Sequence, residues 1–342
     1  MKAARLLALG RPGLIAIENI PDPKPGIGEV VVQVNACGLN RLDLWLEEGG
    51  LPMPSQIPRT PGGEISGVID EVGTDVSEWK VGDRVAVQSN IFCGHCEYCQ
   101  KGEESLCLTS ELIGVQRDGG FAERVAVPAR TLVLLPENVS FTTAAGLTLA
   151  GSTAVHMLTN RTQVKSGEWV LVIGGASGVG SAAIQIARLF NARVIATAST
   201  PAKQSFCRDI GADHVVDSSL VNWHAKVRDL TGKRGVDLVV EHVGGTVLTQ
   251  ALHCLARGGR VVTCGATGGR EVEINLWPFF VKQFQLIGSY GRTRKEIETT
   301  LNWAAAGKLK ASIDCIYHLD QTKEAFLALR ERRINGKALI CP

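Results

Sequence analysis

Residues 169–180 read Trp-Val-Leu-Val-Ile-Gly-Gly-Ala-Ser-Gly-Val-Gly, and an apolar segment rich in small residues follows. This order predicts a buried strand, a glycine-rich turn and the start of a helix. Glycines let the backbone approach a pyrophosphate closely, and a helix N-terminus offers free N–H groups and a positive dipole end. We therefore expect a dinucleotide to bind at Gly175, Ser177, Gly178, Val179 and Gly180.

The turn departs from the pattern G-x-G-x-x-G, because Ser177 stands at the position of the second glycine. Such a turn can also be purely structural, but the order of strand, turn, helix and second strand favours the dinucleotide. Strands alternate with helices from about residue 167 onward, which predicts a parallel, doubly wound sheet. The expected strands are 170–173, 193–198, 215–216, 238–241 and 259–264.

The first part of the chain has a different pattern. Short β-branched runs at 30–34, 65–72 and 84–87 are separated by segments rich in Pro and Gly. They predict an irregular, barrel-like β domain. The chain is therefore expected to be an α/β protein of two domains, which suits its 342 residues.

Composition narrows the class of protein. The net charge is +2 and no basic block is present, which argues against nucleic acid as a partner. No apolar run reaches the roughly 18 residues of a membrane span, and the first residues lack the features of a signal peptide. We expect a cytoplasmic protein. Its six scattered cysteines are expected to be small buried residues, with disulfides as the alternative if the source is a hyperthermophile.

The end of the second predicted strand indicates which nicotinamide cofactor binds. An NAD site usually has an acidic residue there, about 20 residues after the glycines, that binds the ribose 2′-hydroxyl. This chain has no acid there, and its hydroxyls and lysine suit the 2′-phosphate of NADP(H) instead: Ser199, Thr200 and Lys203. Lys203 can alternatively be a solvated charge on a helix face.

Four cysteines cluster with the spacing C-x2-C-x2-C-x7-C, at Cys93, Cys96, Cys99 and Cys107. Four thiolates in a short loop can surround Zn²⁺ tetrahedrally and leave no open position, which is typical of a structural site. We expect one structural zinc, with His95 as a bystander. An iron–sulfur cluster and metal-free reduced cysteines are the alternatives.

The cysteine cluster followed by the dinucleotide turn resembles the medium-chain dehydrogenase/reductase superfamily over essentially the whole chain. Further marks are 61–67 (PGGEISG), 81–85 (VGDRV), 119–123 (GGFAE) and 211–213 (GAD). The resemblance implies a GroES-like catalytic domain at 1–153, a Rossmann domain at 154–288, and a return to the catalytic domain at 289–342. It also implies a homodimer or homotetramer, and it identifies the four-Cys segment as the structural zinc lobe.

Zinc-dependent alcohol dehydrogenases of this superfamily carry a second, catalytic zinc. The positions of its ligands are held here by Asn40, Gly63 and Leu149, and the usual proton-relay hydroxyl is replaced by Leu42. Glu64 is retained, but one carboxylate cannot form a three-ligand site. The resemblance therefore implies an active site of the quinone oxidoreductase type, without catalytic zinc.

Hydride transfer without zinc requires other groups to stabilise the oxyanion. We expect Asn40 to donate to it, and Asp43 and Glu64 to orient Arg41 or each other. The resemblance places Arg41 at a cofactor phosphate and Thr153 at the nicotinamide. Predicted strand ends add three cofactor contacts, Val243, Gly265 and Tyr290, and the apolar candidates for the substrate cleft are Trp45, Leu51, Leu149 and Trp277. Asn40 and Thr153 can instead be turn or helix-start residues, Arg41 can be solvated, and the apolar residues can belong to the core.

These features predict an NADP(H)-dependent reductase of bulky ketones, enones or quinones that lacks a catalytic zinc. One alternative is an alcohol dehydrogenase that recruits zinc through Glu64 and unusual ligands. The other is a non-catalytic NADPH-binding sensor, which would bind the cofactor and turn over no carbonyl compound.

Overall fold

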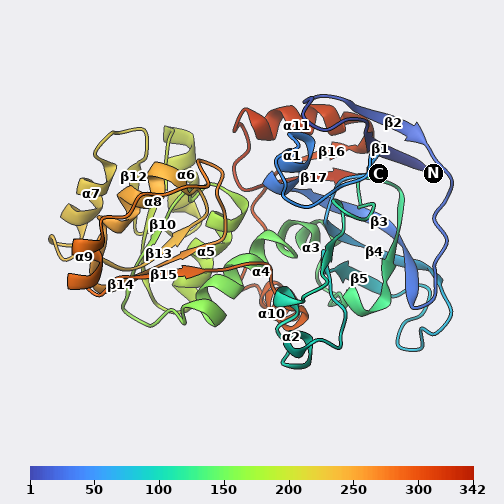
Figure 1. Ribbon diagram of the computed structural model, residues 1–342, viewed down its shortest axis with the longest axis horizontal. Coiled ribbons are helices and arrows are strands. Elements are labelled where there is room, and N and C mark those ends of the chain that lie inside the picture. Colours follow the sequence, from blue (N-terminus) through green and yellow to red (C-terminus); the bar gives the residue numbers. More distant parts are fainter. The chain divides into compact units, whose positions relative to one another are not determined.

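The computed structural model describes all residues 1–342, and they form two compact units. One unit comprises Met1–Ser152 together with Gly291–Pro342, and the other comprises Thr153–Tyr290. Figure 1 shows the red C-terminal segment joining the blue N-terminal strands. The expected boundaries, after residues 153 and 288, differ from these by one and two residues.

The unit Thr153–Tyr290 is built on a six-stranded sheet in which all neighbouring strands are parallel. The strand order is β12-β11-β10-β13-β14-β15. The first strand, β10, is therefore central: β11 and β12 lie on one side of it, and β13, β14 and β15 lie on the other. The bounds are β10 Trp169–Val172, β11 Arg193–Ala198, β12 His214–Asp217, β13 Val236–Glu241, β14 Leu255–Thr263 and β15 Gln285–Gly288. This is the predicted doubly wound sheet, with β15 as an additional edge strand that the sequence pattern did not predict.

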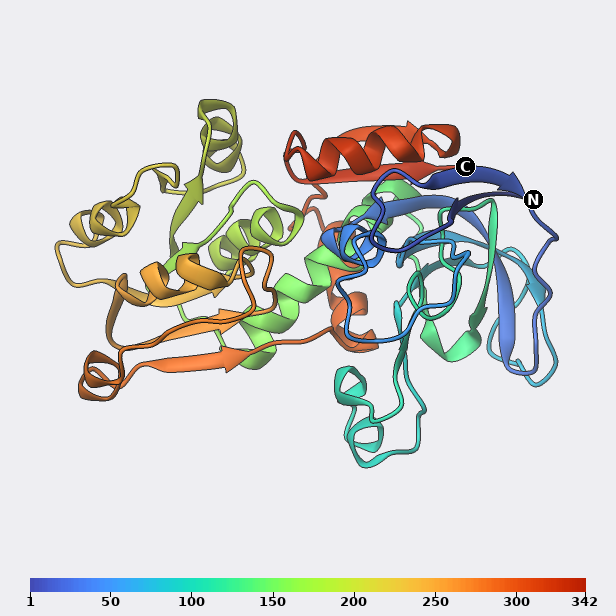
Figure 2. The same ribbon diagram turned by 45° about the horizontal axis from the view of Figure 1, so that its top comes forward.

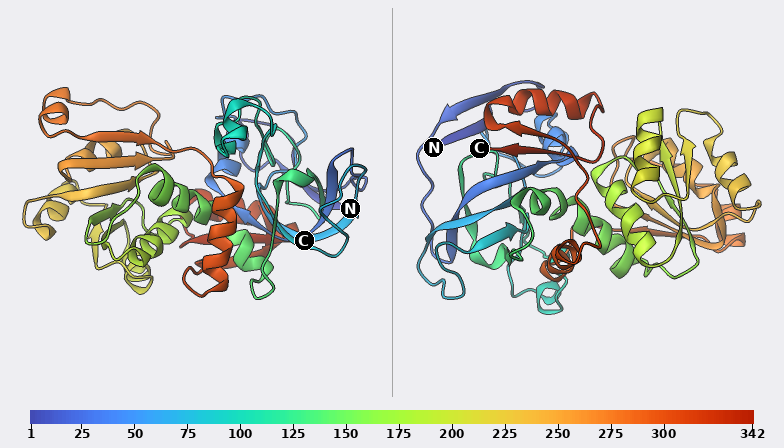
Figure 3. Two further views of the ribbon diagram at one scale, coloured as in Figure 1. Left: turned by 90° about the horizontal axis from the view of Figure 1, so that it is seen from below. Right: turned by 180° about the vertical axis from the view of Figure 1, so that it is seen from behind.

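Helices cover both faces of this sheet (Figure 3). They are α5 Gly178–Leu189, α6 Pro201–Asp209, α7 Trp223–Leu230, α8 Gly245–Leu252 and α9 Leu276–Val281, and the π-helical segment His156–Arg161 precedes the first strand. Buried residues of α7 and α8 pack against central strand residues such as Leu171, Val239 and Val261. The continuous apolar runs of the central strands follow from this burial on both faces.

The other unit is built on a seven-stranded sheet. Six strands follow the order β16-β17-β3-β4-β5-β9, and β8 also pairs with β3. The bounds are β3 Glu29–Leu39, β4 Glu64–Val72, β5 Arg84–Val87, β8 Arg124–Pro128, β9 Leu132–Leu134, β16 Ile313–His318 and β17 Lys337–Cys341. Two small antiparallel pairs complete it: β1 Lys2–Leu6 with β2 Ile15–Asn19, and β6 Asn90–Ile91 with β7 Glu111–Leu112.

The helices of this unit are short, except for the two that follow the return of the chain. They are α1 Arg41–Glu47, α2 Glu97–Gln100, α3 Phe141–Leu147, α4 Ala150–Val155 at the boundary, α10 Arg294–Ala305 and α11 Thr322–Arg330. Figure 2 shows α11 lying over β16 and β17, and the segment with α2 projecting from the body of the unit. No helix of the chain is both long and apolar enough to cross a bilayer.

Strand β17 places a buried lysine next to the residues of the candidate site. It pairs antiparallel with β3, and Ala338 faces Leu39 in this register. The residue before Ala338 therefore lies beside the end of β3, where α1 begins. This residue is Lys337, whose side chain is 3% exposed.

Candidate active site

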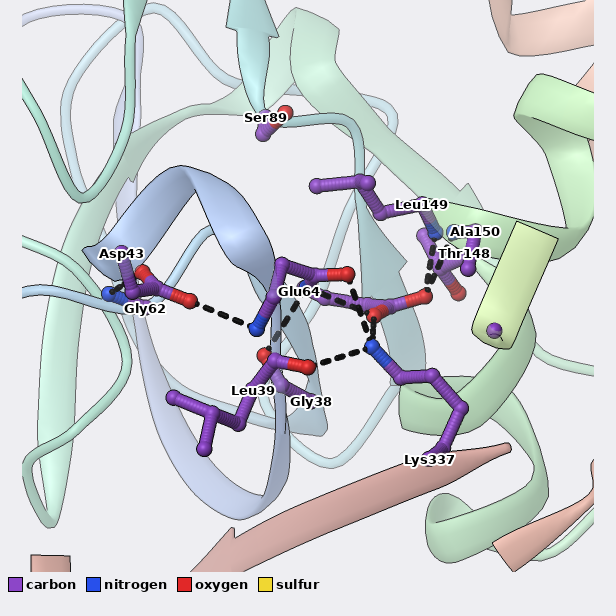
Figure 4. Close-up of polar contacts among 12 residues, drawn as sticks. Gly38, Leu39, Asp43, Gly62, Glu64, Ser89, Thr148, Leu149, Ala150 and Lys337 are labelled. Carbon is purple, nitrogen blue, oxygen red and sulfur yellow. Dashed lines mark hydrogen bonds and ion pairs between the residues drawn. The ribbon is translucent and has the colours of Figure 1, made fainter. Parts of the chain in front are cut away.

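Glu64, the first residue of β4, is fully buried, accepts three hydrogen bonds and forms one ion pair (Figure 4). Its Oε1 accepts from the backbone N–H groups of Leu149 (2.6 Å) and Ala150 (3.0 Å), at the start of α4. Its Oε2 accepts from Asn40 Nδ2 at 2.9 Å and lies 2.6 Å from Lys337 Nζ. Both carboxylate oxygens are therefore engaged, Oε1 by two backbone N–H groups and Oε2 by an amide and an ammonium.

Lys337 is the counter-ion of this carboxylate. Its ammonium donates to Leu39 O (2.8 Å) and Asn40 Oδ1 (2.8 Å) as well as contacting Glu64. Two of the three ammonium donors are used in these hydrogen bonds, and the charge is paired with Glu64. A buried carboxylate without such a partner would be strongly destabilising, so Lys337 compensates the charge of Glu64 inside the unit.

Asn40 and Asp43 form the N-terminal cap of α1. Asn40 N donates to Asp43 Oδ2 (2.8 Å), and Gly62 N donates to Asp43 Oδ1 (3.1 Å). Burial raises the pKa of Asp43 to about 7, while these two hydrogen bonds and the charge of Lys337 oppose the rise. Asp43 therefore ties α1 to the loop that precedes Glu64.

The two acids that were expected to orient Arg41 or each other have other hydrogen-bond partners. Neither Asp43 nor Glu64 contacts Arg41: Asp43 bonds backbone N–H groups, and Glu64 bonds Lys337 and Asn40. The two amide hydrogens of Asn40 are directed to Gly38 O (3.1 Å) and Glu64 Oε2 (2.9 Å). In this geometry Asn40 positions Glu64 and has no hydrogen left to donate to a substrate. Arg41 Nε is buried and has no hydrogen-bond partner.

Three positions hold metal ligands in zinc-dependent alcohol dehydrogenases but other residues in this chain: Asn40, Gly63 and Leu149. All three lie next to the carboxylate of Glu64 or to its backbone. Asn40 and Leu149 both bond Glu64, and Gly63 precedes it. A Cβ added at Gly63 would lie 2.9 Å from Ile113 O and 3.1 Å from the Cβ of Ser89, so the backbone leaves little room for a side chain. The only group of His, Cys, Asp and Glu residues arranged to hold a metal ion in the chain is the four-Cys cluster.

That cluster has the geometry of a closed site. The four sulfur atoms all lie within 4.8 Å of one another, with Cys93 and Cys99 at 3.9 Å and Cys96 and Cys99 at 3.5 Å. Tetrahedral Zn–S bonds of about 2.3 Å would place the sulfurs about 3.8 Å apart. His95 bonds Cys93 O through Nδ1, so its ring is engaged outside the sulfur cluster.

The dinucleotide turn connects β10 with α5 as predicted. Ser177 caps α5 by accepting from Gly180 N (2.9 Å), and Ser177 Oγ also lies 3.0 Å from His242 Nε2. A Cβ on Gly180 would lie 2.3 Å from Gly174 O, so this turn requires glycine at 180. The turn therefore presents the N-terminus of α5, a helix of 12 residues, at the carboxyl ends of the strands.

Other predicted cofactor residues lie at the same ends of strands. Val243 and Gly265 follow β13 and β14, and the nearby acid Glu241 is fully buried and accepts from Val243 N and Gly244 N. Ser199 and Thr200 are exposed after β11, and Thr200 caps α6 by accepting from Lys203 N (3.3 Å). Thr153 and Tyr290 are the first and last residues of this unit.

The predicted substrate residues are not all together. Trp45 lies half-buried on α1, and Leu51 packs in a cluster with Leu6 and Leu46. Trp277 is 71% exposed on α9, just before β15 begins. Because Lys282, after α9, bonds Gly258 near the start of β14, α9 lies where the strands begin rather than where they end.

Comparisons with known proteins agree with this architecture. Residues 26–137 match the family model of the alcohol dehydrogenase GroES-like domain, and residues 178–306 match that of the zinc-binding dehydrogenases. An alcohol dehydrogenase of Geobacillus stearothermophilus is 33% identical over 99% of both chains. The chain belongs to the medium-chain dehydrogenase/reductase superfamily.

Relatives within the superfamily differ in chemistry. The quinone oxidoreductase of Homo sapiens is 31% identical over 95% of this chain and 92% of its own length. An acryloyl-coenzyme A reductase of Sulfurisphaera tokodaii is 30% identical over 95% of this chain and 96% of its own. A solved NAD-dependent alcohol dehydrogenase superposes with a TM-score of 0.95 at 36% identity, covering 100% of both chains. This medium-chain dehydrogenase/reductase is therefore an oxidoreductase.

Sequence reasoning missed Lys337, Ser89 and His242. Lys337 directly precedes an apolar strand, which was a weak sign that its side chain would be buried. Nothing in the spacing of the sequence connected Lys337 with Glu64, because the two residues come from the two separate segments, Met1–Ser152 and Gly291–Pro342, that form this unit (the catalytic unit). Ser89 and His242 lie at ends of short strands, where only the fold shows what they face.

Proposed function

We propose that this medium-chain dehydrogenase/reductase reduces bulky ketones, enones or quinones with NADP(H) and without a catalytic zinc. The observation that carries the proposal is that Glu64 is already engaged by Leu149 N, Ala150 N, Asn40 and Lys337. A carboxylate with both oxygens engaged in this way is a poor metal ligand, and Lys337 already supplies the positive charge. This disfavours the alternative in which zinc is recruited through Glu64.

The nucleotide would be held by the turn Gly175–Gly180 and by residues at the strand ends. Its hydride is the reductant of the reaction when it is bound. Exposed Ser199 and Thr200, with Lys203 close behind, support a preference for the 2′-phosphate of NADP(H), as does the lack of an acid after β11. The similarity to an NAD-dependent enzyme makes this preference the part of the proposal that needs direct measurement.

The substrate class rests on two supports. Alcohol dehydrogenases, quinone oxidoreductases and an acryloyl-coenzyme A reductase among the relatives all act on a carbonyl group or on a double bond conjugated to one. The half-buried Trp45 and the Leu149 side chain provide apolar surface on the catalytic unit. A conjugated or aromatic carbonyl compound suits both.

The four cysteines Cys93, Cys96, Cys99 and Cys107 are proposed to bind one structural zinc. The deciding experiment measures zinc in the dialysed protein and in the Cys93→Ser variant, together with oxidation of NADPH and NADH on a panel of ketones, enones and quinones. One zinc per chain, lost in the variant, together with turnover of the wild type would support the proposal. Two zincs, one surviving in the variant, would establish the zinc-dependent alcohol dehydrogenase. Binding of NADPH without turnover of any compound would favour the sensor.

A further inference from the structure

The polar groups around Glu64 are almost all committed to one another. Lys337 donates two hydrogen bonds and forms an ion pair with Glu64, Asn40 uses both amide hydrogens, and Thr148 donates to Ala144 O. The N–H groups of Leu149 and Ala150 both bond Glu64. None of these groups can donate to a substrate oxygen without breaking a buried hydrogen bond, which would be costly.

Ser89 is the exception among the residues labelled in Figure 4. It lies between β5 and β6, and its backbone carbonyl accepts from Ile113 N at 2.9 Å. Its Oγ accepts a hydrogen bond from the guanidinium of Arg292 and donates none. Because a guanidinium can only donate, the hydroxyl hydrogen of Ser89 remains available.

Ser89 lies close to the backbone of Gly63 and to the guanidinium of Arg292. A Cβ at Gly63, the neighbour of Glu64, would lie 3.1 Å from the Cβ of Ser89 and 3.8 Å from its Oγ. The backbone of Arg292 is held by Gln88, whose Nε2 donates to Arg292 O at 3.1 Å. Ser89 and Arg292 are 1% and 4% exposed, so the charge acts on the hydroxyl in a poorly solvated environment, where electrostatic interactions are strong.

We propose that Ser89, polarised by Arg292, is the hydrogen-bond donor that stabilises the substrate oxygen in place of a metal ion. This rests on the proposed function and completes it at the reacting atoms. The carbonyl carbon, or the β-carbon of an enone, accepts the hydride, and the π electron pair moves onto the carbonyl oxygen. Ser89 stabilises this oxyanion through its O–H, and a proton from solvent then completes the reduced product. The nicotinamide is the group oxidised.

The first arm of the test uses turnover of 2-cyclohexen-1-one and 1,4-naphthoquinone with NADPH. Ser89→Ala should lower kcat about 100-fold, the typical effect of removing one oxyanion donor, with little change in KM or in NADPH affinity. Ser89→Thr keeps a hydroxyl and should retain activity within about tenfold. Ser66→Ala, which also removes a fully buried hydroxyl from the same unit, is the matched control. A Ser89→Ala enzyme with undiminished kcat would overturn the proposal.

The second arm does not depend on turnover, so it remains decisive if the proposed function itself fails. In a Ser89→Cys variant, iodoacetamide labelling of position 89 is followed against pH by peptide mass spectrometry. The proposal expects half-maximal labelling below the pH of about 8.5 that is typical of a free cysteine. Adding Arg292→Gln should raise that value by about one pH unit or more. Because Ser89 is almost fully buried, labelling also tests access by a small molecule. No labelling in the folded protein, or an identical pH profile in both variants, would contradict the assignment.

Discussion

Glu64 and Lys337 form an ion pair from which water is almost completely excluded, with side chains 0% and 3% exposed. The net contribution of such a pair to stability is small, because both charges lose their hydration. Removing one partner is different, since the other charge is then left buried and uncompensated. Replacing Lys337 alone should therefore destabilise the protein far more than the intact ion pair stabilises it.

Lys337→Met should therefore lower the free energy of unfolding by about 3–5 kcal/mol. Urea denaturation of the holoprotein measures this. Lys308→Met, at an exposed lysine, is the matched control and should change little. Combining Lys337→Met with Glu64→Gln should recover part of the loss. If the double variant were as unstable as the sum of both single variants, the ion pair would not be the cause.

The raised pKa of Asp43 predicts how the free energy of unfolding depends on pH. Its folded pKa of about 7 lies above the unfolded value near 3.9, so the folded state binds more protons between these values. Its contribution to stability is therefore present at low pH and is lost as pH rises from about 4 to about 7. Asp43→Asn removes this component, and its unfolding free energy should fall less steeply over the same range. Parallel curves for wild type and variant would show that Asp43 ionises normally.

At the scale of elements, the loop after β11 is expected to select the nucleotide. Ser199→Asp adds a carboxylate that would accept from a 2′-hydroxyl and repel a 2′-phosphate. The Kd for NADPH should rise about tenfold or more while that for NADH falls, each measured by nicotinamide fluorescence. Thr200 is left intact because it caps α6. A variant that keeps the wild-type ratio of the two Kd values would show that this loop does not read the 2′ position.

Elements with a local sequence signal were predicted correctly, and elements without one were not. The buried strands β10, β11 and β13 were predicted because their residues are mostly apolar. The cysteine cluster was predicted because its four residues lie close together in the sequence. Strand β15 was missed because Gln285–Gly288 lies at the sheet edge, mostly exposed, without an apolar pattern. The ion pair of Glu64 with Lys337 was not predicted, because Lys337 comes from a distant segment that no local pattern connects with Glu64.

At the scale of the whole molecule, we predict that the homodimer or homotetramer implied by the resemblance would form through exposed apolar residues of the unit Thr153–Tyr290. Leu276, Trp277 and Phe280 on α9 are 67%, 71% and 57% exposed, and they precede the edge strand β15. An uncovered strand edge next to aromatic side chains is a typical place for self-association. The predicted homodimer or homotetramer would bury this surface.

Trp277→Glu combined with Phe280→Glu should accordingly reduce the mass measured by light scattering to that of a smaller assembly. Val221→Glu, at an apolar residue of the same unit that is 82% exposed, serves as the control and should leave the mass unchanged. A wild-type protein that is already monomeric, or a double variant of unchanged mass, would rule out this surface as the interface.

The division of the catalytic unit into two sequence segments has a consequence for biosynthesis. A ribosome makes Glu64 early and Lys337 late, and the whole of Thr153–Tyr290 is made in between. Until β17 is available to pair with β3, the carboxylate has no counter-ion, and burying it is unfavourable. The dinucleotide-binding unit, which is continuous in sequence, can fold during translation, whereas the catalytic unit is completed only when the last strand arrives. Strand β3 therefore lacks its neighbour β17 until residues 337–341 have been made.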